Sequence, residues 1–325
     1  MFVPAFLLSN VMSLSPKIDE LRVAICNANL DFVCITESWL KDHIVDDIVS
    51  IWGFNLIRRD RKVIDHGGIC MYVRNSIRFN VLQDFMEENF EVLWVRICPQ
   101  RLPRGISSII VGTVYHPPSA SDALILDYLH DSMSRLEAQF SDFGLILLGD
   151  FNKLNLARIT SAFGLKQIVP FTTRGQNKLD LVLTNLNKYY DEPKKLPPFG
   201  FSDHATVEVR PLARNDFPVN KVLLKSRDLR STKRLAMRKY LEEVDLESLV
   251  GSKNSCDQKT KFLELIIKTG MDLLIPLKSK TIFFNEPPWI NKQLKYLIFE
   301  RQRALSRGDL NNFRSLRNRV NRLRK

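Results

Sequence analysis

Short apolar runs recur along the first two thirds of the chain, each bounded by turn-forming or polar residues. Runs of four to eight residues suited to β-structure, bounded in this way, are typical of buried strands. The pattern predicts strands at residues 2–8, 32–35, 68–73, 92–97, 108–115, 145–148, 179–184 and 205–209.

Two stretches between these runs carry apolar residues at helical spacing. One begins at Ser15-Pro16, where serine suits an N-cap and proline suits the first helical turn. The other runs from Ser121 to about Phe140. Strands that alternate in part with helices predict a large α/β or α+β sandwich, which we expect to end near Pro211.

Beyond residue 211 the strand pattern stops. Four segments with helical periodicity follow, and the last places apolar residues on one face with arginines between them. We therefore predict a first domain over residues 1–211 and a basic, all-helical region over residues 212–325. The expected helices cover residues 234–250, 259–274, 289–305 and 310–323.

The charge of the chain is concentrated in this second region. The 325 residues carry a net charge of +12; residues 1–210 have a net charge of −2 and residues 211–325 a net charge of +14. Such asymmetry favours a module that faces a polyanion, with Arg314 and Arg317 of the last helix as candidate nucleic-acid contacts. The alternative is a solvated helical surface that happens to be basic.

Composition narrows the class of protein. A hydrophobic content of 45% and a mean hydropathy of −0.13 are ordinary for a globular chain. The five cysteines occur singly, without a Cys-x-x-Cys spacing, so neither a zinc site nor a disulfide framework is indicated. Without a signal peptide or a long apolar run, we expect an intracellular protein with no membrane partner.

Polar side chains stand where several predicted strands end. In Gly-Asp-Phe-Asn, Asp150 and Asn152 follow an apolar run, and Glu37 follows another. Carboxylates and amides without cysteine are typical of a site for Mg²⁺ or Mn²⁺, and with a histidine they fit phosphodiester or phosphomonoester hydrolysis. The candidate residues are Asn10, Glu37, Tyr115, Asp150, Asn152, Asp180, Asp203 and His204.

Each of these residues taken singly also has an ordinary structural explanation. Gly-Asp after a strand is commonly a turn, and Asn10 alone is a turn residue. Tyr115 could be a core tyrosine with a solvated hydroxyl, and Asp180 with His204 could be a structural pair. Arg174, just before the strand of Asp180, is a candidate for phosphate contact.

The order of the motifs carries more information than any one of them. The segments NVMSL, CITESWL, VYHPPS, GDFN, KLDLVLTN and SDH follow one another between residues 8 and 210. In this order they resemble the endonuclease/exonuclease/phosphatase superfamily, and more closely the apurinic-type endonuclease domain of non-LTR (LINE-type) retrotransposon polyproteins. Residues 211–325 resemble the helical connector that precedes the reverse transcriptase there, which suggests a fragment or truncated copy.

This resemblance implies a fold of two packed mixed β-sheets flanked by helices, a four-layer sandwich. It also implies a metal site in which Glu37 is the principal ligand, supported by Asn10, with Asp203 in the inner or outer shell. Mg²⁺ is the expected ion and Mn²⁺ a possible substitute. Met12 stands where many members of the superfamily have a polar or acidic residue, which puts a second metal in doubt.

The catalytic roles follow from the same resemblance. Asp150 would orient or deprotonate the attacking water, and Asn152 would hold that water or the phosphate. His204, oriented by Asp180, would stabilise the charge on the scissile phosphate. Tyr115 would donate a hydrogen bond to a phosphate oxygen.

The implied function is a Mg²⁺-dependent DNA endonuclease that nicks one strand and leaves a 3′-hydroxyl. Its expected partners are target DNA and the RNA of the element, with no small-molecule cofactor beyond the metal, and its expected location is the nucleus. Two alternatives remain: a phosphatase of the same superfamily acting on inositol phosphates or lipids, and a non-catalytic fragment that binds nucleic acid through its basic tail.

Overall fold

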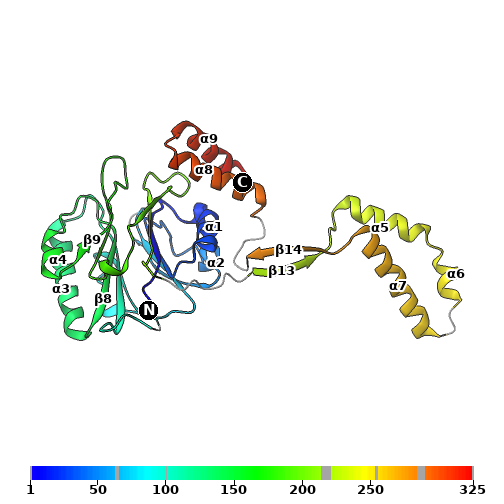
Figure 1. The fold of residues 1–325 in the computed structure, drawn as a ribbon, viewed down its shortest axis with the longest axis horizontal. Coiled ribbons are helices and arrows are strands. Elements are labelled where there is room, and N and C mark those ends of the chain that lie inside the picture. The colour runs from blue at the N-terminus through cyan, green and yellow to red at the C-terminus, as the bar shows by residue number, and fades with distance from the viewer. Residues whose placement is uncertain are drawn as a thin grey trace. The chain divides into compact units, whose positions relative to one another are not determined.

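Two six-stranded β-sheets form the centre of the molecule in the computed structural model, which describes residues 2–62, 66–99, 101–213, 221–252, 255–283 and 290–323 (Figure 1). The first sheet has the order β11 (Lys194–Leu196), β12 (Thr206–Val209), β1 (Phe6–Asn10), β2 (Phe32–Thr36), β4 (Ile69–Arg74) and β3 (Phe54–Arg59). The second has the order β5 (Arg78–Val81), β6 (Glu91–Cys98), β7 (Ser108–Tyr115), β8 (Phe143–Asp150), β10 (Asp180–Thr184) and β9 (Lys166–Gln167).

Side-chain alternation explains why the two sheets stack. In β1, Phe6 and Leu8 enter the core between the sheets, whereas Leu7 packs outward with the helix α1 (Ile18–Ala28). In β8, Leu148 enters the same core, and Leu147 packs outward against α3 (Asp122–Gln139). Strands that are apolar on both faces must be covered on both faces.

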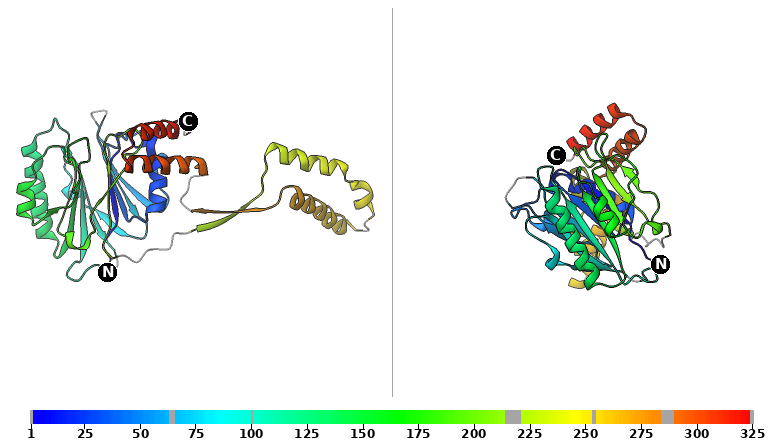
Figure 2. Two further views of the ribbon diagram at one scale, coloured as in Figure 1. Left: turned by 45° about the horizontal axis from the view of Figure 1, so that its top comes forward. Right: turned by 90° about the vertical axis from the view of Figure 1, so that its left-hand side faces the viewer.

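Helices therefore lie outside each sheet. The helices α1 and α2 (Asp46–Val49) cover the first sheet, and α3 and α4 (Ala157–Ala162) cover the second (Figures 1 and 2). Short 3₁₀ turns at Ser15–Lys17, Gln83–Phe85 and Asn187–Tyr189 connect the larger elements. The predicted fold of two packed mixed sheets flanked by helices is confirmed.

The C-terminal region departs from its prediction in one respect. It contains the expected helices as α5 (Ser231–Glu243), α6 (Leu246–Gly251), α7 (Cys256–Leu274), α8 (Lys292–Ser306) and α9 (Leu310–Leu323). It is not all-helical, however, because β13 (Lys221–Ser226) and β14 (Lys278–Phe283) pair as an antiparallel ribbon. Four lysines in these two strands mask their β-pattern, since strands are expected to be rich in apolar and β-branched residues.

The chain forms two compact units, and the first is made of two stretches that are separated in the sequence by the second. The first comprises residues 1–218 together with 285–325, and the second comprises residues 219–284. Thus α8 and α9 pack with the β-sandwich, while β13, β14 and α5 to α7 form the second unit. The domain boundary after residue 211 stays a prediction, and residues 214–220 and 284–289 around these crossings lie outside the described residues.

The second unit has few buried side chains. Gly270 of α7 allows close packing with α5, because an added Cβ would lie 2.4 Å from a ring carbon of Tyr240. Arg227 donates to the carbonyls of Met271 and Ile275 at the end of α7.

Among the described residues, no helix is both long enough and apolar enough to span a membrane.

Candidate active site

Strand register brings three predicted residues into one row across the second sheet. Tyr115 ends β7 and is the parallel partner of Asp150, which ends β8. Asp180 begins β10 and is the antiparallel partner of Asp150. The alternation that sends Val111, Leu148 and Val182 into the inter-sheet core directs these three side chains to the same face.

The facing sheet supplies its residues from the corresponding ends. Asn10 ends β1, and Glu37 follows β2, which runs parallel to β1. The antiparallel β12 begins beside this end, as the 2.9 Å contact between Ser9 Oγ and Thr206 Oγ1 shows, and His204 lies two residues before its start. Residues separated by almost 200 positions in the sequence therefore meet at one edge of the sandwich.

A side-chain amide links the two sheets. Asn10 Nδ2 donates to Glu37 Oε1 and to Asp150 Oδ2, both at 2.9 Å, while Asn10 Oδ1 accepts from the amide of Met12 at 3.2 Å. Asn10 is fully buried, so these bonds fix the separation of the two carboxylates. In this orientation Asn10 holds the carboxylates together, and its predicted role as a metal ligand, which needs the amide oxygen, stays a prediction.

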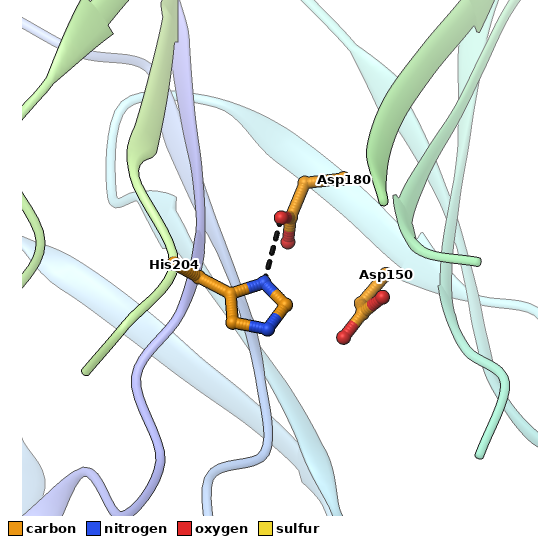
Figure 3. A group of neighbouring side chains, drawn as sticks. All are labelled: Asp150, Asp180 and His204. Atoms are coloured by element: carbon orange, nitrogen blue, oxygen red, sulfur yellow. Dashed lines mark hydrogen bonds and ion pairs between the residues drawn. The ribbon is translucent and has the colours of Figure 1, made fainter. Parts of the chain in front are cut away.

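His204, Asp180 and Asp150 form a buried group between the sheets (Figure 3). His204 Nδ1 lies 2.8 Å from Asp180 Oδ2, and the ring points toward Asp150. Burial alone would lower the pKa of His204, but the hydrogen bond and charge of Asp180, with the charges of Asp150 and Asp203, raise it. The site therefore favours a positively charged imidazole, which suits contact with a phosphate.

Asp150 has an environment suited to accepting a proton. Its carboxyl is almost fully buried, and burial followed by repulsion from Asp180 raises its pKa from 3.8 to about 6. A carboxylate with a pKa nearer neutrality is a stronger base than an ordinary one, so it is better able to take a proton from water. Tyr115 is also buried, and burial and the charges of Glu37 and Asp150 raise its pKa, which keeps its hydroxyl a donor.

The Gly-Asp-Phe-Asn segment is shaped by its backbone. A Cβ at Gly149 would lie 1.8 Å from the carbonyl oxygen of Val114, so only glycine permits β7 and β8 to pair here. Asn152 adopts a left-handed φ of 51°, its amide donates to Asp150 Oδ1, and its side chain donates to the carbonyl of His116. Gly149 and Asp150 end β8, and the turn that follows holds the Asp150 carboxylate through the amide of Asn152.

The residues present fit a divalent cation. Glu37 is half-buried, lies beside Asp150 and is held in a left-handed conformation, with φ at 50°. Asp180 Oδ1 is buried and accepts no hydrogen bond from the described residues. Ligand atoms of Asp150, Asp180 and His204 also lie within 4.8 Å of one another. Because the bond to Asp180 and the raised pKa disfavour His204 as a ligand, the carboxylate of Glu37 is the better ligand for such a cation.

The remaining predicted residues lie at the rim of the site. Asp203 is 47% exposed, and its Oδ2 accepts from Arg174 Nε at 2.8 Å. This pairing joins a predicted metal residue to a predicted phosphate contact. Arg317 of α9 stacks over the ring of Phe201, 4.7 Å from its centroid, beside the loop that carries His204. Arg314 is exposed on the same helix.

Several groups that support the site were missed from the sequence. Arg61 lies over the ring of Tyr115 and forms an ion pair with Glu91, the β6 partner of Tyr115. Thr173 Oγ1 accepts from the amide of Asp180, and Trp39 Nε1 donates to Glu37 Oε2. The position of Trp39 in the CITESWL motif was a usable signal; the other contacts depend on strand pairing that local sequence does not display.

The sequence also matches a family model. The model of the endonuclease/exonuclease/phosphatase family matches residues 7–204, which include all eight residues assembled at this end of the sandwich. The chain belongs to the endonuclease/exonuclease/phosphatase family. The family embraces nucleases and phosphatases, whose active sites use divalent metals.

A search of solved structures finds one with the same fold and others that align less well. An AP endonuclease from Leishmania major aligns with a TM-score of 0.53 and 15% identity, over 63% of this chain and 86% of that one. The endonuclease domain of TRAS1, a telomere-specific non-LTR retrotransposon, aligns with a TM-score of 0.48 and 16% identity, over 64% and 97%. The 3′ phosphatase NExo from Neisseria, bound to a product DNA hairpin, aligns with a TM-score of 0.44 and 14% identity, over 64% of this chain and 99% of that one. A search of curated proteins finds no match to the sequence.

Proposed function

We propose that this chain is a Mg²⁺-dependent DNA endonuclease that nicks one strand and leaves a 3′-hydroxyl. The observation that carries the proposal is the buried His204–Asp180 pair facing Asp150 across the same edge at which Asn10 joins Asp150 to Glu37. These contacts support the assignment of a base, a cation for phosphate and an acidic metal site to one edge of the sandwich.

The chemistry can be assigned atom by atom. Asp150 takes a proton from a water whose oxygen attacks phosphorus, and the bond between phosphorus and the 3′ oxygen breaks. The departing 3′ oxygen takes a proton from solvent water and becomes the 3′-hydroxyl. His204 and Tyr115 donate hydrogen bonds to the non-bridging oxygens as their charge increases. Asp180 accepts from His204 Nδ1 and so orients the ring and favours its charged form. A divalent cation bound at Glu37, supported by Asp203 at the rim, would neutralise charge on the phosphate and on the departing oxygen.

DNA is the substrate class favoured by the charge distribution. Residues 211–325 carry a net charge of +14, and Arg317 with Arg314 lies on α9, which packs with the catalytic unit. Arg174 adds a cation at the rim beside Asp203. We further propose that the protein acts in the nucleus as part of a LINE-type retroelement polyprotein, with the RNA of the element as a second partner.

A plasmid assay tests the activity. Supercoiled plasmid incubated with the full chain and Mg²⁺ should become relaxed circles, and EDTA should prevent this. Glu37→Ala and His204→Ala should abolish nicking, whereas His130→Ala, a substitution on the outer helix α3, should not. Release of phosphate from inositol phosphates with intact DNA would instead favour the phosphatase, and a gel shift without cleavage would favour a binding fragment.

A second readout tests which bond of the phosphodiester is broken. Nicked product should be extended directly by a DNA polymerase that requires a 3′-hydroxyl, without prior phosphatase treatment. Products that require removal of a 3′-phosphate before extension would contradict cleavage of the bond to the 3′ oxygen.

A further inference from the structure

The C-terminal helices α8 and α9 pack against the β-sandwich through α1. Val23 of α1 belongs to the same buried apolar cluster as residues from both helices. The members contributed by the C-terminal segment are Ile290, Leu294, Leu297, Ile298, Ala304, Phe313, Leu316 and Val320. The hairpin of α8 and α9 therefore buries its apolar face partly against α1. Figure 1 shows the two helices next to α1.

A charged pair lies inside this contact. Arg301 of α8 is 2% exposed, and its Nη1 donates to Oε2 of Glu20 in α1 at 2.9 Å. Glu20 is equally buried. A buried ion pair contributes little net stability, because desolvation of both charges offsets their attraction. The contact between Arg301 and Glu20 therefore matters more for the positions of the elements it joins than for stability.

The same carboxylate oxygen also holds a loop of the active site. Glu20 Oε2 accepts from the amide of Gly200 at 3.0 Å, so it joins α1, α8 and the segment of residues 199–204. Gly200 adopts a φ of 53°, and a Cβ there would lie 2.9 Å from Lys17 Cε, so the chain passes close to Lys17.

Hydrogen bonds continue from this loop to the reacting groups. Ser202 donates from its amide to the carbonyl of Phe199 and from its hydroxyl to the carbonyl of Asn10, at 3.0 and 2.6 Å. The amide of His204 in turn donates to Ser202 Oγ at 3.2 Å. A continuous set of contacts thus runs from Arg301 through Glu20 and the Gly200 loop to His204.

We propose that Arg301 is a positioning residue of the nuclease: through Glu20 it fixes the loop of residues 199–204 and thereby the imidazole of His204. The inference rests on the proposed function for its kinetic test. It makes part of the region beyond residue 211 a working component of the catalytic unit. Loss of the contact should lower the rate of the chemical step, because small displacements of catalytic groups reduce rates steeply.

Matched substitutions in α8 test the proposal in the full chain. Arg301→Met removes the buried guanidinium, and Arg303→Met removes an exposed one on the same helix that pairs only locally with Glu300. Arg301→Met should lower kcat for plasmid nicking roughly tenfold or more, with KM for DNA within about twofold. Arg303→Met should leave both unchanged. Full kcat in the folded Arg301→Met protein, with only a lower Tm, would overturn the proposal.

Chemical rescue tests whether the missing guanidinium accounts for the lost rate. Methylguanidinium at millimolar concentration should restore nicking by Arg301→Ala but not by His204→Ala, relative to the same concentration of sodium salt. If Arg301→Met does not fold, the pair of substitutions Glu20→Gln and Arg301→Met removes both charges and should fold. That protein should still show the low kcat, and full activity in it would contradict the proposal.

A spectroscopic arm separates this inference from the proposed activity. The ¹⁵N and ¹H shifts of the His204 ring should change in Arg301→Met and remain as in the wild type in Arg303→Met. If the wild type does not nick DNA while these shifts still respond to Arg301, the proposed function fails and the positioning contact stands. Unchanged His204 shifts in Arg301→Met would overturn the positioning contact whatever the activity.

Discussion

At the scale of single residues, the candidate site places an acid where an acid is costly. Asp150 is 1% exposed and lies in a register row with Asp180, so two carboxylates repel each other away from water. Hydrogen bonds from Asn10 and from the amide of Asn152 compensate in part. An active site commonly keeps such a destabilising group because the chemistry requires it.

Replacing that acid should raise stability as it removes activity. The folded pKa of Asp150 is about 6 against an ordinary 3.8, so wild-type stability falls as pH rises between these values. At pH 7.5 in EDTA, the free energy of unfolding of Asp150→Asn should therefore exceed that of the wild type by about 2–3 kcal/mol. Urea titrations at pH 7.5 and pH 4 measure this difference, which should vanish at pH 4. An equal difference at both pH values, or one in the exposed control Asp131→Asn, would contradict the argument.

The pairing of His204 with Asp180 leads to a prediction about pH dependence. Asp180 raises the pKa of His204, so the charged imidazole persists to higher pH than it would alone. In Asp180→Asn the decline of nicking on the alkaline side should therefore move to lower pH, with kcat reduced roughly tenfold or more. Profiles of kcat against pH measure this. Asp122→Asn, which breaks the comparable contact of His116 with an exposed carboxylate, should leave the alkaline limb in place.

At the scale of elements, the pairing of β7 with β8 sets the position of Asp150. The carbonyl of Val114 occupies the space that a side chain at position 149 would need. The Gly149 of Gly-Asp-Phe-Asn therefore permits the sheet pairing that sets the position of Asp150. Elements of weaker pattern were missed for an equally local reason: β3 is an edge strand that ends in two arginines, so apolar content does not distinguish it from a loop.

Two glycine substitutions separate the effect of collision from that of backbone conformation. Gly149→Ala places a methyl group 1.8 Å from a backbone oxygen and should lower the free energy of unfolding by more than about 3 kcal/mol. Gly164→Ala has a φ of 58° but open space around it, so it should cost only about 1 kcal/mol. Urea denaturation measures both. Similar costs for the two variants would contradict the importance of the close approach of β7 and β8.

At the scale of the whole molecule, the arginines of α9 and the predicted catalytic groups occupy one compact unit although they lie far apart in the sequence. The helix α9 brings Arg317 to Phe201, three residues before His204. We therefore expect DNA affinity and cleavage to depend on residues beyond 211 as well as on the sandwich.

The salt dependence of DNA binding tests this expectation. Replacing Arg314 and Arg317 by glutamine should weaken binding and reduce the slope of log K against log salt by up to about 2, since each lost phosphate contact removes about 0.9. Fluorescence anisotropy with a labelled duplex measures the slope. The same changes at Arg135 and Arg158, on helices α3 and α4 outside the second sheet, should leave it unaltered. An unchanged slope in the α9 variant would exclude these two arginines from the interface.

The sequence by itself determined which polar residues lie at the ends of the buried strands. Apolar runs depend on local side-chain chemistry, so the positions of Asp150, Asp180 and Tyr115 could be predicted together with their strands. The motif order also predicted the family. The β13–β14 ribbon escaped prediction because its lysines hide a pairing made between strands more than 50 residues apart.

Only the tertiary structure decided how the two sheets align and what packs against them. The Asn10 contact between Glu37 and Asp150, and the contact of Arg301 with Glu20, join residues separated by 27 to 281 positions. Such contacts depend on long-range packing and loop closure, which no local pattern encodes. The sequence therefore predicts the chemical groups of the site, and the fold determines which of them contact one another.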